Sequence, residues 1–421
     1  MKIKLIDIIY SLTEALDLVS SPINNHHKDV TILSYYIGRE MGLSDEKLEK
    51  LILSAMIHDI GVLPLTLDER YKNFEFEFSN PNRHAEIGYF ITKDFLPLKD
   101  IADIIRYHHT YWYEGAGNNI EIDEENFILP NIIHVADRIS ITLNKKKEVL
   151  KQVPNILSKI KENTGMMFIP EVTEAFLKIS NKEFIWFELL YPENFFSKLK
   201  QSDYIKKEIK NDMIFKYAEL MRKMIDFRSE FTSMHSRAVA YVAYALSILS
   251  GFSHEHSQLV KIAGLIHDIG KLSIPKEVLE KKGKLTDEEF NTIKYHAYYT
   301  RKILSNIQGI GSVVEWASNH HEKLDGSGYP YHYEVNRLST ESRIIAVADI
   351  FTALAENRPY RPGISIDEIK KILVIMVGNG KLDGEVVRLA VENIEKLDKI
   401  RIKIQAESND EWKIFEQNLK R

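Results

Sequence analysis

Apolar residues recur at helical spacing along most of this chain. Residues 43–61 (LSDEKLEKLILSAMIHDIG) and 252–270 (FSHEHSQLVKIAGLIHDIG) place them three and four positions apart and end on glycine, a signal for the C-terminus of a helix. Alternation typical of strands is sparse. The pattern therefore predicts an all-α protein.

Two helix starts are also visible in the sequence. Thr286 is followed three positions later by Glu289, which predicts a capping box at the start of a helix that carries His296. The Asn-Pro pair at 80–81 predicts a similar start before His84. Histidines are thus expected on these two helices.

A set of histidines and aspartates occurs twice in register. HDIGK (267–271) has a counterpart in HDIGV (58–62), and in both copies another histidine lies 32 positions before the HD histidine. In both copies a histidine pair begins 24 positions after a further histidine, and the aspartate of VAD lies 28 positions after the second histidine of that pair. The two sets are His26, His58, Asp59, His84, His108, His109 and Asp137, and His235, His267, Asp268, His296, His320, His321 and Asp349. Such clusters of histidine and aspartate favour metal sites.

The repeat extends beyond the last aspartate, because residues 167–179 resemble residues 381–394 in position and pattern. We therefore interpret the chain as two tandem helical bundles that arose by internal duplication, each with ligands from several helices facing one interior. The predicted domains are 1–195 and 213–421, joined by a charged helical connector at 196–212.

Composition narrows the classes of function. The chain has 421 residues, a net charge of -5 and a sequence pI near 6.3, which gives no sign of binding to a nucleic-acid polymer. It has no cysteine, so His, Asp and Glu are the available metal ligands. The longest apolar run, 238–252, is too short to span a bilayer, and the N-terminus does not resemble a signal peptide. We expect a cytoplasmic protein without a membrane partner.

The ligand count of the second set points to more than one metal ion. Five imidazoles and two carboxylates exceed what one four-coordinate ion needs. Two neighbouring divalent ions can share a bridging carboxylate and act on a phosphodiester. Imidazole and carboxylate donors without thiolate suit iron or manganese, and leave zinc and nickel open.

The second half resembles a known family. The pattern H…HD…H…HH…D is that of the HD phosphohydrolase superfamily, and the stretch from His235 to Arg361 resembles the HD-GYP family of bacterial cyclic di-GMP phosphodiesterases. The motifs that carry this resemblance are HDIGK (267–271), HHEKLDGSGYP (320–330) and RPYR (358–361). The stretch from His235 to Arg361 covers about a third of the chain, and the similarity continues at a lower level to the C-terminus.

The resemblance implies a role for each motif residue. Asp268 would bridge the ions; His235, His267 and Asp349 would complete one ion, and His296, His320 and His321 the other. Lys271 would meet the substrate phosphate, and Arg358 and Arg361 the other phosphate of a cyclic dinucleotide, a role that guanidinium chemistry suits. A helix-terminal salt bridge is the alternative for the two arginines.

The glycine-rich loop after the histidine pair is expected to shape the pocket mouth. Gly326 and Gly328 supply tight turns, and Asp325 and Tyr329 are expected to organise the substrate pocket. A purely structural loop is the alternative.

One departure from the family concerns a third metal. Some members carry a glutamate four residues before the first histidine, where this chain has Phe231, while Glu230 is one position off. We therefore predict a site with two ions. For such a site we expect hydrolysis of cyclic di-GMP to end at the linear product pGpG at least as readily as at GMP.

The first copy keeps every ligand but lacks the substrate-binding residues. Val62 stands in place of Lys271, the loop 110–119 (TYWYEGAGNN) has no GYP, and no RPYR follows Asp137. This copy could be a metal-loaded regulatory or dimerising domain, a phosphohydrolase with another substrate, or an inert copy. We favour regulation or assembly.

The leading hypothesis is an enzyme that hydrolyses cyclic di-GMP to pGpG, and further to GMP if the final cleavage occurs. The alternatives are a 3′,3′-cyclic GMP-AMP phosphodiesterase and a catalytically silent cyclic-dinucleotide sensor. The sequence leaves open the native metal, a homodimer, signalling-protein partners and the regulatory signal.

Overall fold

The structure is a computed structural model that describes residues 3–19, 25–65, 82–93, 95–112, 124–202, 205, 207–209, 211–228, 234–357 and 362–419. The chain divides into two compact units, one of residues 4–208 and the other of residues 209–421 with residues 1–3. Each unit is described below by itself as the N-terminal and the C-terminal unit.

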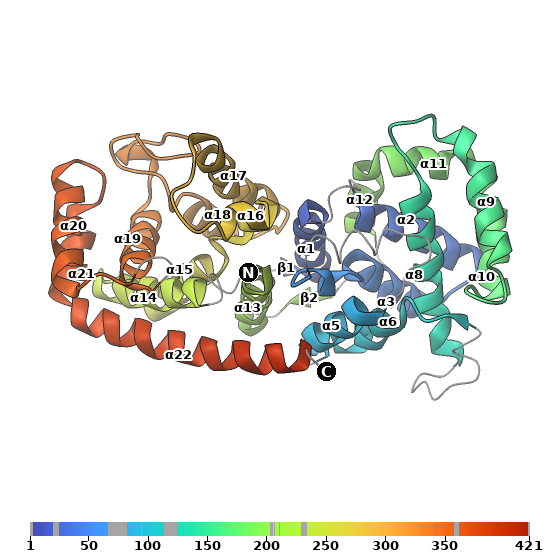
Figure 1. Cartoon of the computed structure of the whole chain (residues 1–421), viewed down its shortest axis with the longest axis horizontal. Coiled ribbons are helices and arrows are strands. Elements are labelled where there is room, and N and C mark those ends of the chain that lie inside the picture. Colours follow the sequence, from blue (N-terminus) through green and yellow to red (C-terminus); the bar gives the residue numbers. More distant parts are fainter. Residues whose placement is uncertain are drawn as a thin grey trace. The chain divides into compact units, whose positions relative to one another are not determined.

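The N-terminal unit is a helical bundle (Figure 1). Its elements are α1 (Leu5–Val19), α2 (His26–Glu40), α3 (Asp45–Ile57), η1 (Ile60–Val62), α5 (Asn82–Thr92), η2 (Leu96–Ile101), α6 (Ala102–Tyr107), α8 (Glu124–Thr142), η3 (Leu150–Gln152), α9 (Val153–Glu162), α10 (Pro170–Ile179), α11 (Glu183–Leu190) and α12 (Pro192–Gln201). Helix α2 packs on α3 and α8, while α5 packs on α6 and on the short η1. These contacts place the predicted ligands around one interior.

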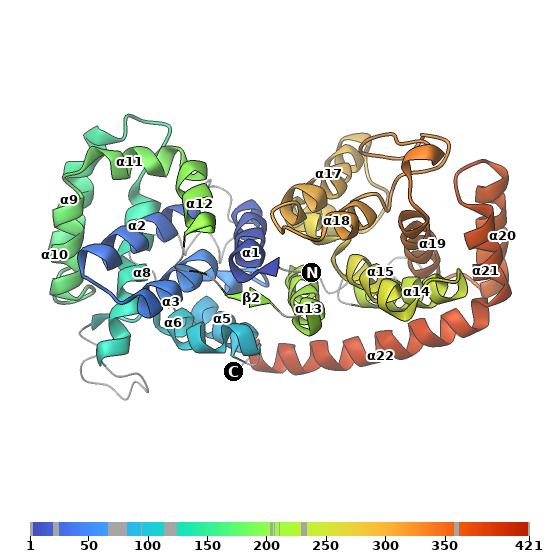
Figure 2. The same cartoon turned by 180° about the vertical axis from the view of Figure 1, so that it is seen from behind.

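The C-terminal unit repeats this arrangement, and Figure 2 shows it from behind. Its elements are α13 (Asn211–Arg228), α14 (His235–Leu249), α15 (His254–Ile266), η4 (Ile269–Ser273), α16 (Lys276–Leu279), α17 (Asp287–Leu304), α18 (Gly311–Ser318), η5 (Val335–Arg337), α19 (Thr340–Ala355), α20 (Ile366–Gly378), α21 (Gly384–Glu392) and α22 (Ile394–Leu419). Helix α14 packs on α15 and α19, and α17 packs on α18 and η4. These are the counterparts of the pairs in the N-terminal unit.

The repeat continues after the last aspartate, as the sequence predicts. Helix α10 packs on α2 and α8 of its unit, and α21 packs on α14 and α19 of the other. The described strands, β1 (Ile3–Lys4) and β2 (Glu208–Ile209), form one two-stranded sheet. The prediction of an all-α protein with two tandem bundles is therefore confirmed.

The segment 196–212 is not a continuous helix. Helix α12 ends at Gln201, and β2 follows with Glu208 exposed and Ile209 buried. The prediction of a helical connector is therefore wrong at residues 208–209, which form a strand between α12 and α13.

The helix starts follow from side-chain caps. Ser44 and Ser253 accept hydrogen bonds from backbone N–H groups at the starts of α3 and α15. The capping box of Thr286 and Glu289 at the start of α17 is present, as predicted. The Asn-Pro pair at 80–81 lies outside the described residues.

Helices α3 and α15 end earlier than their glycines suggest. They end at Ile57 and Ile266, and the HD residues turn into η1 and η4. A Cβ atom on Gly270 would lie 1.9 Å from the carbonyl oxygen of His296, and one on Gly61 would lie 1.9 Å from that of His84. These glycines therefore permit close packing of the HD turn on the next helix; the prediction that they end the preceding helix is wrong.

No helix in the part of the chain that the structure describes combines the length and the apolar character that a bilayer crossing requires.

Candidate metal centres

Each predicted ligand of the C-terminal unit lies at a helix end or faces the interior from a helix. The first residue of α14 is His235, and the histidine-aspartate pair of the HD motif directly follows α15. Helices α17 and α19 carry His296 and Asp349, and the histidine pair lies just beyond α18. Helix packing thus brings together residues that span more than a hundred positions of sequence.

The seven predicted ligands lie close together, arranged around Asp268 and Asp349. Its Oδ2 lies 3.2 Å from Nε2 of His267, and its Oδ1 lies 3.6 Å and 3.8 Å from Nε2 of His296 and His320. Asp349 lies 3.0 Å from Nε2 of His235 and 3.9 Å from Nδ1 of His321. The donor atoms form two groups, each with all atoms within 4.8 Å of one another: His235, His267 and Asp268, and His296, His320 and His321.

Backbone carbonyls orient the central imidazoles. Nδ1 of His267, His296 and His320 lies 2.8, 2.6 and 2.7 Å from the carbonyl oxygen three residues earlier. Because a carbonyl oxygen only accepts, Nδ1 carries the proton and Nε2 presents a lone pair. Two such lone pairs face each other where Nε2 of His296 and His320 lie 3.2 Å apart. A cation between them would relieve that repulsion, so this donor set fits a metal ion.

Burial favours the neutral form of His296 and His321. It lowers the pKa of His296 to about 4 and that of His321 to about 3, although the aspartates oppose the change. Burial would raise the pKa of Asp268, but His267 and Lys271 hold it well below its ordinary value. Neutral imidazoles and ionised carboxylates are the forms that bind metal.

Lys271 lies beside the bridging carboxylate. Its Nζ is 2.6 Å from Oδ2 of Asp268, and its side chain is 22% exposed. The aspartate is buried, so the ammonium group lies between the metal ligands and the solvent side of the site.

Glu356 is a site residue that the sequence analysis missed. Its carboxylate oxygens lie 3.1 and 3.2 Å from Nδ1 of His235, and Nε2 of Gln405 in α22 donates to Oε1 over 2.7 Å. Burial would lower the pKa of His235, but Glu356 and Asp349 raise it to about 10. Metal binding at Nε2 would have to displace that proton. The sequence signal that could have identified Glu356 is its position directly after the helix that carries Asp349.

The glycine-rich loop is held against the histidine pair. Glu322 is buried and accepts from the backbone N–H groups of Tyr331 and Tyr333 over 2.7 and 3.0 Å. A Cβ atom on Gly328 would lie 2.4 Å from Cα of Glu322, so only glycine fits there. The ring centroid of Tyr329 lies 4.8 Å from that of His321. The loop thereby covers one side of the imidazole cluster.

The other predicted substrate-binding residues have different surroundings. Asp325 is exposed, and its Oδ1 accepts from the backbone N–H and the hydroxyl of Ser327 over 3.0 and 2.7 Å, the contacts of a local turn. Arg358 and Arg361 lie outside the described residues, as do Glu230 and Phe231. Their predicted roles remain predictions.

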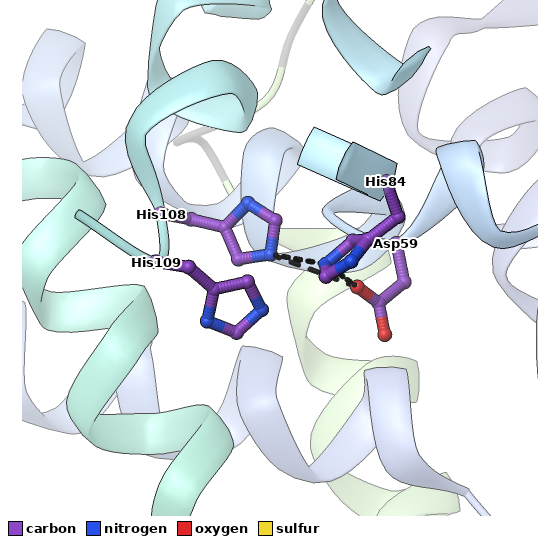
Figure 3. Close-up of side chains that lie close together, drawn as sticks. All are labelled: Asp59, His84, His108 and His109. Carbon is purple, nitrogen blue, oxygen red and sulfur yellow. Dashed lines mark hydrogen bonds and ion pairs between the residues drawn. The ribbon is translucent and has the colours of Figure 1, made fainter. Parts of the chain in front are cut away.

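The N-terminal unit brings its own ligand set together (Figure 3). Oδ1 of Asp59 lies 3.1 Å from Nε2 of His84 and 3.6 Å from Nε2 of His108. With His109, these residues have donor atoms that all lie within 4.8 Å of one another. A second group on Asp59 contains His26 and His58.

Asp137, the last predicted ligand of the N-terminal set, pairs with the arginine that follows it in the sequence. Oδ2 of Asp137 lies 2.5 Å from Nη2 and 3.0 Å from Nε of Arg138, and the arginine side chain is 1% exposed. Burial would raise the pKa of Asp137, but Arg138 and His26 lower it. The residue after Asp349 is Ile350, which carries no charge.

Comparison with known proteins agrees with this geometry. Two family profiles, both described as HD domain, match residues 24–142 and 219–386. These ranges contain the two ligand sets.

Relatives match over the whole chain or over part of it. A 3′3′-cGAMP-specific phosphodiesterase 1 of Vibrio cholerae is 33% identical and aligns with 96% of this chain and 94% of its own. The cyclic di-GMP phosphodiesterase response regulator RpfG of Xanthomonas campestris is 36% identical over 35% of this chain and 39% of its own.

A solved structure has the same fold. The cyclic GMP-AMP-specific phosphodiesterase V-cGAP3 of Vibrio cholerae superposes with a TM-score of 0.68 at 21% identity, covering 94% of this chain and 98% of that one. Full-length similarity, the two HD profiles and the converging ligands lead to one conclusion: the chain belongs to the HD-GYP family of metal-dependent phosphodiesterases and carries a second HD domain at its N-terminus.

Proposed function

We propose that the C-terminal unit hydrolyses a 3′,3′-cyclic dinucleotide at a two-metal site. In this proposal His235, His267 and Asp349 hold one ion, His296, His320 and His321 hold the other, and Asp268 bridges them. The observation that carries it is the pair of Nε2 lone pairs 3.2 Å apart beside a buried, ionised Asp268. When bound, two divalent cations stabilise charge on the phosphoryl oxygens; iron or manganese suits these donors.

The chain's own residues supply the remaining contacts. Lys271 reaches the substrate phosphate by leaving Asp268, a short movement for a partly exposed side chain. It adds positive charge where charge develops during phosphodiester cleavage. Tyr329 packs over His321 and limits water access on that side. Arg358 and Arg361 hold the second phosphate by bidentate pairing.

The preferred substrate proposed is 3′3′-cGAMP rather than cyclic di-GMP. This reverses the order of the two substrates expected from the motifs. The support is the relative of that specificity, which aligns with 96% of the chain, whereas the cyclic di-GMP enzyme RpfG aligns with 35%. Cyclic di-GMP remains the second candidate because the HDIGK, GYP and RPYR motifs resemble that family. Linear dinucleotide is the expected product of a two-metal site.

In this proposal the N-terminal unit serves regulation or assembly. Val62 replaces the lysine that would meet a phosphate, and it is buried. The charged group beside the N-terminal ligands is instead Arg138, which is engaged by Asp137 and cannot reach a substrate.

The test is purification under anaerobic conditions, followed by metal quantification and turnover assays with both cyclic dinucleotides. We expect bound metal, hydrolysis of both substrates with a higher kcat/KM for 3′3′-cGAMP, and loss of hydrolysis in His267→Ala. A higher kcat/KM for cyclic di-GMP would reverse the substrate assignment. Metal without turnover of either compound would identify a sensor instead of an enzyme.

A further inference from the structure

A buried arginine, Arg138, lies beside the N-terminal ligand set, at the position where the C-terminal unit has Ile350. We propose that the N-terminal unit binds a single transition-metal ion between Asp59, His84, His108 and His109. Arg138 replaces the second ion that the repeated ligand set would otherwise hold. This inference concerns a site outside the proposed catalytic centre and does not depend on cyclic-dinucleotide hydrolysis.

Four donor residues lie close together in the proposed site, namely Asp59, His84, His108 and His109. Figure 3 shows His84 and His108 directed at each other beside Asp59, with the ring of His109 next to that of His108. All four residues are buried, and their donor atoms lie within 4.8 Å of one another. One carboxylate and three imidazoles form a complete four-coordinate set for a first-row ion such as zinc, iron or manganese.

Hydrogen bonding prepares this group for a cation. Nδ1 of His108 lies 2.6 Å from the carbonyl oxygen of Ile105, which leaves Nε2 with a lone pair. That nitrogen is 3.3 Å from Nε2 of His84 and 3.6 Å from Oδ1 of Asp59. Electron-rich atoms are thus gathered on one side of Asp59.

A cation lies beside the other group, which consists of His26, His58 and Asp59. The buried guanidinium of Arg138 lies 2.5 Å from Asp137, whose second oxygen lies 3.1 Å from Nε2 of His26. The side chain of Arg138 is 1% exposed, so its guanidinium group is held in the interior beside Asp137. At low dielectric, a divalent ion bound to Asp137 would be strongly repelled.

The C-terminal unit has the opposite charge arrangement. Nδ1 of His235 faces Glu356, whereas Nδ1 of His26 faces the neutral hydroxyl of Ser140 at 3.0 Å. Among the described residues, the ammonium group of Lys271 lies beside the C-terminal ligand Asp268, and its side chain is partly exposed. The C-terminal set therefore has more negative charge available to offset two divalent ions.

The experiment measures metal stoichiometry in the full-length chain. The C-terminal site is first disabled by His267→Ala, Asp268→Ala and His320→Ala, which remove donors from both of its groups, so that the remaining metal reports on the N-terminal unit. The protein is dialysed against Co²⁺. The bound cobalt is then quantified, and its visible absorption spectrum is measured. We expect one ion per chain. Two ions, or none, would overturn the inference.

Two single variants in this background locate the ion. His84→Ala should lose it, while His26→Ala should keep one ion, because His26 belongs to the other group, beside Arg138. Loss in His26→Ala with retention in His84→Ala would place the ion in the other group and overturn the inference.

A third variant tests the arginine itself. Arg138→Ile copies the residue of the C-terminal unit and should raise the stoichiometry from one to two, while Arg138→Lys should stay at one. A folded Arg138→Ile that still binds one ion would remove the assigned role of Arg138. The two histidine variants decide the location of the ion even if Arg138→Ile does not fold. Turnover by the unmodified chain tests the proposed function separately.

Discussion

The imidazole of His235 donates from Nδ1 to the carboxylate of Glu356, whose two oxygens lie 3.1 and 3.2 Å away. The same carboxylate accepts from Gln405, so the side chain is held from the other side by α22. A carboxylate behind a metal-binding histidine fixes the ring and raises its basicity. We therefore treat Glu356 as a positioning residue for the proposed metal site.

Replacing Glu356 should weaken metal binding before it affects anything else. Glu356→Ala is expected to lower affinity for one ion by roughly 10–100-fold, and Glu356→Gln by less, because the amide oxygen still accepts from His235. The measurement is a titration of the metal-free protein with Mn²⁺. Glu407→Gln, at an exposed position on α22, is the matched control and should bind normally. Equal affinities in all four proteins would exclude the positioning role.

Lys271 should matter for turnover and not for metal content. Lys271→Met removes the ammonium group 2.6 Å from Asp268, and we expect kcat/KM to fall on the order of 100-fold, as for the loss of one group that stabilises developing charge. Steady-state kinetics and metal quantification are measured on the same sample. If metal content fell in parallel with turnover, Lys271 would be a structural partner of Asp268 and not a substrate contact.

Gly270 should tolerate no side chain. Gly270→Ala places a Cβ atom 1.9 Å from the carbonyl oxygen of His296, a backbone atom that cannot move without shifting α17. We expect a loss of roughly 3 kcal/mol or more in the free energy of unfolding, seen as a lower Tm. Gly311→Ala is the control, since a Cβ atom there meets no atom within 4 Å. Similar Tm values for the two variants would refute the packing argument.

Asp29 should make the N-terminal unit less stable as pH rises. Burial raises the pKa of its carboxyl to about 7, although Lys145 opposes the change. The folded state therefore binds more protons than the unfolded state between the ordinary carboxyl pKa and about 7. Stability is lost across that window, by at most roughly 1.4 kcal/mol per pH unit.

The measurement is Tm between about pH 5 and pH 8 for the wild type and Asp29→Asn, a window set by the raised carboxyl pKa. The wild-type Tm should fall relative to that of the variant as pH rises. Asp103→Asn, at an exposed position, should follow the wild type. Parallel curves for wild type and Asp29→Asn would contradict the expected titration.

Much of the fold could be predicted from the sequence because the patterns that indicate it are local or occur twice. Helical spacing, the capping box at Thr286 and the two sets of ligands in register predicted an all-α protein with two bundles. The strand after residue 201 was missed, because a short charged segment has the same composition in a solvated helix and in an edge strand.

The sequence by itself determined which residues are candidate ligands, because histidines and aspartates are rare and recur at matched intervals in the two halves. Only the tertiary structure decided which charged side chains contact these candidate ligands. Glu356 reaches His235 across 121 positions, and Arg138 turns inward to Asp137, although both are ordinary charged residues of helical segments in the sequence. The direction of a side chain depends on how its helix is rotated and packed, and the spacing of residues in the sequence does not determine that rotation.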